Sequence, residues 1–255
     1  METASGKLAE FSVPKAYRAQ ALLSKKIITQ DGLPEKIRLV AGVDVAYAGE
    51  LAIGAVAVMD YEALKLLESQ TATCTVRFPY VPTLLSFREI PPAIAAIGKL
   101  KLQPDVFLVD AHGLAHPFRF GFACHLGLAL GKPTIGVAKS RLIGEPKEIG
   151  KDVFLVHEGE IVGALVTTRK GAKPVYVSVG HLVSLSTAVN IVEHCTRGGR
   201  IPEPLLAAHR IASEKRKREM EMLEKPYVPP SGHSESRRDA YAKRNGSPNS
   251  KRPDS

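Results

Sequence analysis

Two aspartates stand in the sequence where apolar residues would be expected. Asp44 lies inside the run Val40–Tyr47, whose other members suit a buried strand, and Asp110 follows the apolar run Val106–Val109. A buried carboxylate without a partner is costly to desolvate, so each aspartate needs a cation, hydrogen bonds or a proton. For either aspartate alone, a residue in a turn at a strand end is the simpler interpretation. Adjacent strands, however, would bring both carboxylates within reach of one hard cation.

Two further side chains could extend this site. Glu89 follows Arg88 on a predicted helix between the two strands and could complete an oxygen-rich metal site, although alone it would be an ordinary surface glutamate. Lys139 follows the apolar run Thr134–Val137, where an ammonium group could neutralise a phosphate or orient a water. Because loop lysines are usually solvated, Lys139 is a weak signal by itself.

Several common catalytic motifs are excluded. His112 and His116 have the spacing of a zinc-binding helix, but Gly113 stands where the catalytic glutamate of a zinc peptidase is needed. The sequence also has neither a glycine-rich phosphate loop nor the Gly-x-Ser-x-Gly turn of serine hydrolases. P-loop nucleotide hydrolysis and the commonest serine hydrolase chemistry are therefore not expected.

The composition is that of a globular protein. The chain has 255 residues, of which 44% are hydrophobic and 24% charged, and this predicts a single catalytic domain over residues 1–223. Its apolar runs are too short to span a membrane, and residues 1–10 lack the layout of a signal peptide. We expect a cytoplasmic protein. The three cysteines are expected to be reduced, buried thiols.

The positive charge is concentrated near the C-terminus. The net charge is +9, and residues 215–255 contain eleven Lys or Arg and six Asp or Glu, which gives +5 there and leaves about +4 for the rest. Residues 224–255 are predicted to form a basic, disordered tail because they lack apolar periodicity. Attraction of the tail to nucleic acid and simple solvation remain equally open.

The elements that must position the candidate side chains follow from apolar periodicity and turn residues. Strands are predicted at Arg38–Tyr47, Leu51–Asp60 and Lys65–Val76 as an antiparallel meander, then at Val106–Asp110 and Thr134–Val137, with three more within Asp152–Val179. Helices are predicted at Pro14–Ile28, Pro82–Leu102 with an interruption at Pro91 and Pro92, from near Arg119, and at Ser184–Thr196 and Pro204–Leu223. This order predicts an α/β fold in which helices flank a central mixed β-sheet, the layout of the ribonuclease-H-like fold.

Together these segments resemble the endonuclease V family, whose fold is ribonuclease-H-like. The resemblance covers about residues 8 to 210 and follows the family's motif order. Its motifs are Ala41–Tyr47, Phe78–Glu89, Asp110–Gly121, Gly136–Ser140, Val179–His181 and Arg200–Pro204.

The resemblance implies a DNA repair endonuclease that recognises deoxyinosine, the product of adenine deamination. Such an enzyme hydrolyses the second phosphodiester bond 3′ to the lesion and leaves a 3′-hydroxyl and a 5′-phosphate. On the matching positions, Asp44, Glu89 and Asp110 would hold Mg²⁺, for which Mn²⁺ is an expected substitute. Lys139 would assist at the scissile phosphate, and His209 would occupy the family's fourth site position.

The resemblance also implies how the substrate is bound. Pro79, Tyr80 and Pro82 would belong to a rigid wedge that enters the duplex beside the lesion, since prolines fix an extended backbone and a tyrosine ring can replace a lost stacking partner. The remaining implied residues form two groups. Arg88, His116 and Arg119 would contact DNA or order the pocket loop, and Leu85, Ala111, Gly113 and Gly136 would surround the flipped base.

Four positions depart from the family's pattern. Ala111 and Thr83 stand where glycine is common, Phe118 replaces a common arginine, and Ser184 replaces a common aspartate. The methyl group of Ala111 could narrow a pocket that reads the base through its backbone. Activity is therefore expected, with lesion preference the property most open to change.

Two alternatives remain. An inosine-directed ribonuclease would use the same chemistry, because contacts to phosphates tolerate a 2′-hydroxyl. A noncatalytic binder of deaminated nucleic acid would keep the fold, but it would have little reason to retain carboxylates where phosphates approach. The expected partner is damaged DNA, with inosine-containing RNA as the alternative, and the protein is expected to act as a monomer.

Overall fold

The computed structural model of the protein describes residues 12–169 and 171–224. Two compact units divide the chain, Met1–Glu221 and Met222–Ser255, and the fold belongs to the first. The tail predicted from residue 224 lies almost wholly outside the described residues, so its disorder and the boundary at residue 223 stay predictions. No helix in the described ranges is long and apolar enough to cross a membrane.

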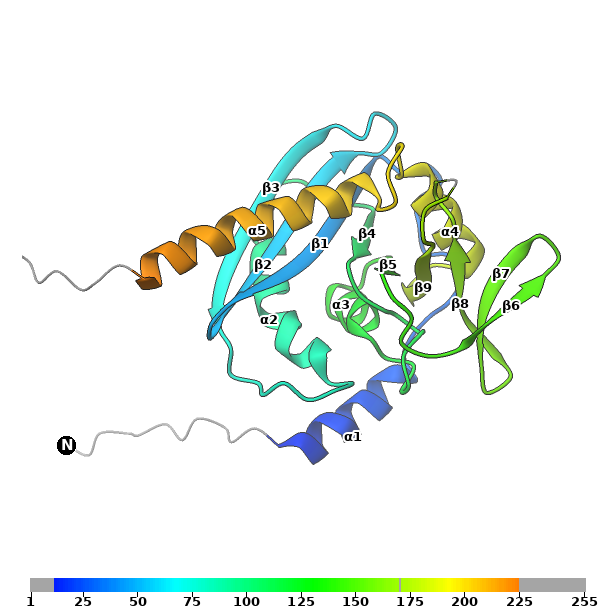
Figure 1. Ribbon diagram of the computed structural model, residues 1–255, viewed down its shortest axis with the longest axis horizontal. Helices are drawn as coiled ribbons and strands as arrows, with labels where there is room; N and C mark the ends of the chain where they lie inside the picture. The colour runs from blue at the N-terminus through cyan, green and yellow to red at the C-terminus, as the bar shows by residue number, and fades with distance from the viewer. Residues whose placement is uncertain (1–11, 170, 225–255) are drawn as a thin grey trace, which may run out of the picture. The chain divides into compact units, whose positions relative to one another are not determined.

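The described strands form one mixed sheet in the spatial order β3-β2-β1-β4-β5-β9-β8-β7-β6 (Figure 1). β1 pairs antiparallel with β2, as β2 does with β3, whereas β1, β4 and β5 run parallel. The strands are β1 (Leu39–Ala48), β2 (Leu51–Asp60), β3 (Leu66–Thr75), β4 (Val106–Val109), β5 (Thr134–Ala138), β6 (Glu145–Ile149), β7 (Asp152–His157), β8 (Glu160–Val166) and β9 (Val175–His181). The predicted meander and the mixed α/β architecture are confirmed.

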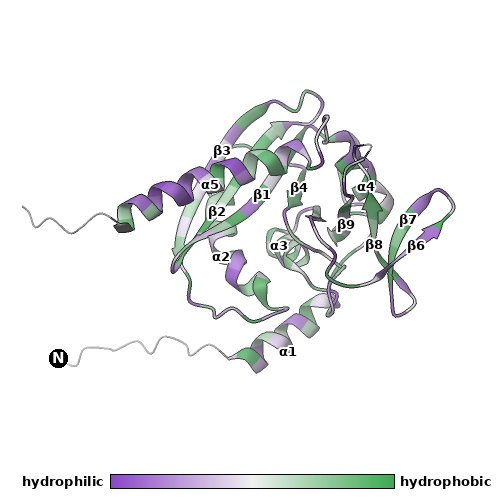
Figure 2. Ribbon diagram, in the orientation of Figure 1, coloured by the Kyte–Doolittle hydropathy of each residue, from purple (hydrophilic) through white to green (hydrophobic). Residues whose placement is uncertain are grey.

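Helices cover both faces of this sheet (Figure 1). The helices are α1 (Val13–Ser24), α2 (Leu85–Ile97), α3 (Phe122–Leu130), α4 (Leu185–His194) and α5 (Glu203–Glu224). α2 and α3 bury residues such as Ala93 and Leu126 against one face, and α4 and the start of α5 bury residues such as Ile191 and Leu205 against the other. Figure 2 shows the hydrophobic strands between these layers and the hydrophilic outer surface of α5.

Three predictions of local structure need correction. α2 continues through Pro91 and Pro92, since the fixed φ of proline is compatible with a helix and this part of α2 packs closely on β2, where a Cβ at Gly54 would lie 2.2 Å from the Pro92 carbonyl oxygen. β6 had no apolar signal because all of its residues are exposed at the sheet edge. Cys124 and Cys195 are buried free thiols, as predicted, but Cys74 is only half-buried.

Candidate active site

Strand alternation decides which face carries the two aspartates. Val40 and Leu108 belong to the core on the α4 and α5 side, and alternate residues of a strand share a face. Asp44 and Asp110 therefore project to that same side, one residue past the paired Val43 and Val109. The backbone nitrogen of Asp110 donates to the Val43 carbonyl at 3.0 Å, which ties the two strand ends together.

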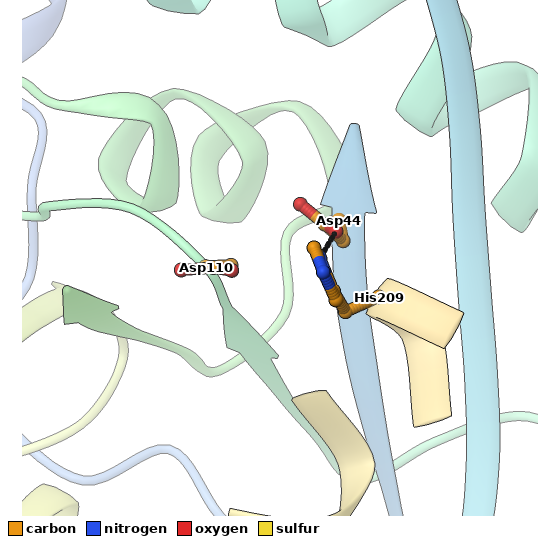
Figure 3. Close-up of side chains that lie close together, drawn as sticks. All are labelled: Asp44, Asp110 and His209. Carbon is orange, nitrogen blue, oxygen red and sulfur yellow. Dashed lines mark hydrogen bonds and ion pairs between the residues drawn. The ribbon is translucent and has the colours of Figure 1, made fainter. Parts of the chain in front are cut away.

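His209 joins these carboxylates from α5. Its Nδ1 lies 2.8 Å from Oδ2 of Asp44, across 165 residues of sequence (Figure 3). Gly42 permits the approach, because a Cβ at this position would lie only 1.9 Å from the Pro204 carbonyl oxygen at the start of α5. The two aspartate side chains are 12% exposed and His209 is 57% exposed, so the cluster opens to solvent on the histidine side.

Lys139 and Glu89 flank this cluster. The Lys139 ammonium group pairs with Oδ2 of Asp110, directly after β5 ends. Glu89 is buried on α2, and burial, together with the negative charges of Asp44 and Asp110, raises its pKa to about 8. Burial also raises the pKa of Asp110, although Lys139 opposes this shift. The site thus holds several carboxylates close together in a partly desolvated space. A bound cation would offset the repulsion between their negative charges.

The donor set fits a divalent cation. One ligand atom from each of Asp44, Asp110 and His209 lies within 4.8 Å of the others. Two carboxylates with open positions for water suit Mg²⁺, and the imidazole also suits Mn²⁺. Glu89 stands outside this set of three, so its predicted place as a metal ligand stays a prediction, while His209, predicted for the family's fourth site position, lies among the possible ligands.

A cavity of about 450 Å³ opens beside the cluster. Its wall includes Glu89, Asp110 and Lys139 together with the predicted pocket residues Leu85 and Ala111. The other two predicted pocket residues have a packing role instead. A Cβ on Gly113 would lie 2.0 Å from the Val179 carbonyl oxygen, and one on Gly136 would lie 2.5 Å from the Gly113 nitrogen. These glycines allow backbone segments to pack closely next to the cavity.

The predicted wedge projects at the mouth of this cavity. Tyr80 is 70% exposed, Pro79 and Pro82 are exposed, and Tyr80 and Pro82 line the opening. Arg88 supports the wedge from α2, since its guanidinium lies 4.6 Å from the centre of the Tyr47 ring and donates to the Phe78 carbonyl at 3.3 Å. Arg88 is thus already engaged inside the protein.

His116 and Arg119 order the loop between β4 and α3. His116 is buried, and its Nδ1 accepts from the backbone nitrogen of Phe118. Burial, and then the nearby His112, lower its pKa to about 4, so at neutral pH it carries no charge for a phosphate. Arg119 pairs with Glu158 and Glu160 at 3.5 and 3.2 Å. Of the two predicted roles, loop ordering is the one that these contacts favour.

The structure explains two of the departures from the family's pattern. Thr83 has φ +70°, a left-handed conformation that favours glycine. Ser184 caps α4, where its hydroxyl accepts from the Thr187 nitrogen, and aspartate serves the same purpose at this position of a helix. Ala111 fits in the cavity wall, and Phe118 is an exposed ring 5.4 Å from the ring of Tyr17.

Two residues near the cavity, His112 and Gln20, were not assigned to the site from the sequence. His112 lines the cavity and its Nε2 lies 3.0 Å from the Ser140 carbonyl. Gln20 on α1 is fully buried and contacts two loops of the site. The signal for Gln20 was a polar residue on the apolar stripe of a predicted helix, at helical spacing from Ala16. His112 stood out in the sequence only through its spacing from His116 and its place in the Asp110–Gly121 motif.

Comparison with known proteins identifies the family of this chain. A sequence model of the endonuclease V family matches residues 21–210. Endonuclease V of Thermofilum pendens is 48% identical over 205 residues, covering 80% of this chain and 88% of that protein. The crystal structure of endonuclease V from Streptomyces avermitilis has a TM-score of 0.77 at 36% identity, covering 82% of this chain and 94% of that one.

A further solved structure contains nucleic acid. Endonuclease V of Ciona intestinalis, in complex with a 23mer DNA containing an inosine followed by a ribo-adenosine, has a TM-score of 0.72 at 31% identity, covering 81% of this chain and 98% of that one. Relatives and solved structures thus share the fold and the enzyme class, and the protein is an endonuclease. The chain belongs to the endonuclease V family.

Proposed function

We propose that this endonuclease repairs DNA by recognising deoxyinosine and hydrolysing the second phosphodiester bond on its 3′ side, with Mg²⁺ as cofactor. One observation carries the proposal: Asp110, one of three side chains that could together hold a metal ion, lines a cavity of about 450 Å³ that the exposed Tyr80 also lines. The inosine-containing DNA bound by the Ciona relative supports the choice of lesion.

The chain's own residues divide the work at the scissile phosphate. Asp44, Asp110 and His209 would hold Mg²⁺, which when bound supplies an activated water and neutralises charge on the phosphorane. The ammonium group of Lys139 lies at the edge of this set, paired with Asp110. Glu89, with its raised pKa, would hold a proton there until a cation approaches and favours the ionised form.

The cavity and the cation site meet at Asp110, so a base held in the cavity would lie beside the phosphate to be cut. A base turned out of the helix would enter the cavity, and Tyr80 would fill the space that it leaves. The uncharged His116 and the backbone around Ala111 present polar groups without a net charge, which suits recognition of a neutral base. The carboxylates would meanwhile face the phosphates of the same strand.

An inosine-directed ribonuclease is the second candidate. The DNA in the Ciona complex carries a ribo-adenosine directly after the inosine, so that relative accommodates a 2′-hydroxyl on the 3′ side of the lesion. The same chemistry would serve RNA in this chain. In either case we propose that the protein acts as a monomer in the cytoplasm.

The test offers the protein a labelled duplex with one deoxyinosine, an undamaged duplex and an inosine-containing RNA, each with Mg²⁺ or EDTA, and maps the product ends. A Mg²⁺-dependent nick one nucleotide beyond the deoxyinosine, with a 3′-hydroxyl, is expected. Faster cleavage of the RNA would instead establish the ribonuclease. Tight lesion binding without cleavage of any substrate would refute both in favour of a noncatalytic binder.

A further inference from the structure

Helix α1 packs against the wedge segment, residues 78–84. Ala16 on α1 forms a small apolar cluster with Phe78 and Leu84, which lie at either end of the wedge segment. The hydroxyl of Tyr17 reaches the same segment, 3.4 Å from Oγ1 of Thr83. α1 therefore supports the wedge segment from a second side, in addition to Arg88 on α2.

Gln20 extends this support to a second loop. Its Nε2 donates to the Thr83 carbonyl at 2.8 Å and to the Phe120 carbonyl at 3.2 Å. Because both acceptors are carbonyls, only the amide nitrogen can face them, and the orientation of the side chain is thereby set. One buried amide thus bridges the wedge segment and the loop between β4 and α3.

The buried Gln20 side chain destabilises the fold in one respect in which an apolar side chain would not. Oε1 of Gln20 has no hydrogen-bond partner among the described residues, although the side chain is fully buried. Burying an unsatisfied carbonyl is unfavourable, and an apolar side chain of the same length would avoid it. The benefit of glutamine at this position therefore lies in its two donated hydrogen bonds.

Both bonds end where the backbone is strained. Thr83 itself has φ +70°, and Arg119, next to Phe120, has φ +52°, values that side-chain-bearing residues rarely adopt. Such conformations persist only where the surroundings hold them. Tyr80 precedes Thr83 by three residues, and Gly121, which follows Phe120, lines the cavity. Gln20 therefore connects the wedge segment to the cavity wall through its two hydrogen bonds.

We infer that Gln20 is a positioning residue for lesion recognition: it fixes the wedge relative to the cavity that receives the flipped base. The inference rests on the proposed function and deepens it. Without the two hydrogen bonds, the loops would relax toward ordinary backbone conformations, and binding would have to restore their spacing at the expense of affinity. The metal-ligating residues would stay in place, since none of them contacts α1 through these bonds.

The test compares Gln20→Met with the wild type. Methionine keeps the length and most of the packing but donates no hydrogen bond. Binding is measured with Ca²⁺ in place of Mg²⁺ on matched duplexes with and without deoxyinosine. We expect the Kd for the lesion duplex to rise about tenfold, the effect of one net hydrogen bond, with the Kd for undamaged DNA unchanged. The single-turnover cleavage rate at saturating enzyme with Mg²⁺ should stay near the wild-type value.

Val192→Ala is the matched control, because Val192 is fully buried on α4, which packs on β8 and β9 and makes neither of the Gln20 hydrogen bonds. It should lower the melting temperature at least as much while keeping the wild-type ratio of the two Kd values. If both variants lose the Kd difference between the two duplexes equally, Gln20 contributes only to stability and the inference is refuted. A wild-type ratio of the two Kd values in Gln20→Met would also overturn the inference.

A second variant covers the case in which Gln20→Met does not fold. Tyr17→Ala removes a half-buried ring from the surface of α1 and should fold. It should weaken lesion binding in the same direction, and unchanged discrimination would refute the positioning role of α1. If the wild type itself does not distinguish the two duplexes, the proposed function fails instead, so the two failures are separable.

Discussion

Substitution of Gly42 by alanine tests how the site is assembled. The added Cβ would lie 1.9 Å from the Pro204 carbonyl oxygen and 2.7 Å from the Leu205 nitrogen, whereas ordinary contacts begin near 3.4 Å. The start of α5 would thus have to move from β1 by about 1.5 Å, since both obstacles are backbone. His209 lies one turn farther along α5 and would move away from Asp44.

Two effects of known size follow from this displacement. Overpacking of a core contact costs about 1–3 kcal/mol, which for a domain of this size lowers the melting temperature by roughly 3–10 °C. Displacement of a site residue by about 1 Å can slow an enzyme about 100-fold. Gly42→Ala should therefore fold, melt at a lower temperature and cut the deoxyinosine duplex about 100-fold more slowly.

The assay measures thermal unfolding and initial cleavage rates at a temperature at which both proteins are folded. Gly199→Ala is the control, because a Cβ there would have its nearest described neighbour at 3.8 Å and its backbone conformation needs no glycine. It should match the wild type in both measurements. A Gly42→Ala protein with wild-type stability and rate would refute the close packing of α5 on β1 as the support of His209.

Three further changes test other parts of the site. Asp44→Ala or Asp110→Ala should reduce cleavage at least about 100-fold while a gel-shift assay still detects lesion binding, and wild-type rates in both would show that the metal assignment is wrong. Tyr80→Ala should lose about 1–3 kcal/mol of lesion binding, the value of one stacked base, before its cleavage rate at saturation falls; equal binding would remove the wedge role. Glu89→Gln tests pH dependence in EDTA: the pKa of Glu89 is raised to about 8 from 4.5, so its contribution to stability is present below pH 4.5 and lost as the pH rises through 8. The wild-type melting temperature should fall over that range more steeply than that of Glu89→Gln, and parallel curves would contradict the shift.

Local sequence patterns predicted most of the elements and singled out the two central aspartates. The apolar runs around Asp44 and before Asp110 predicted both strands, because alternation and burial leave their mark in consecutive residues. A charged residue inside such a run is conspicuous for the same reason. The extended backbone expected around Tyr80 could also be predicted from the sequence, since prolines restrict the backbone locally.

Contacts between distant segments were decided only by the tertiary structure. The approach of His209 to Asp44 depends on the close packing at Gly42, and no local pattern records which helix a glycine will face. Arg119 is a surface arginine by sequence, yet in the fold its charge is committed to Glu158 and Glu160. A side chain's role depends on the partners that the fold brings to it from elsewhere in the chain. The sequence therefore determined which groups could do chemistry, and the packing of α5 and the loops decided which of them meet.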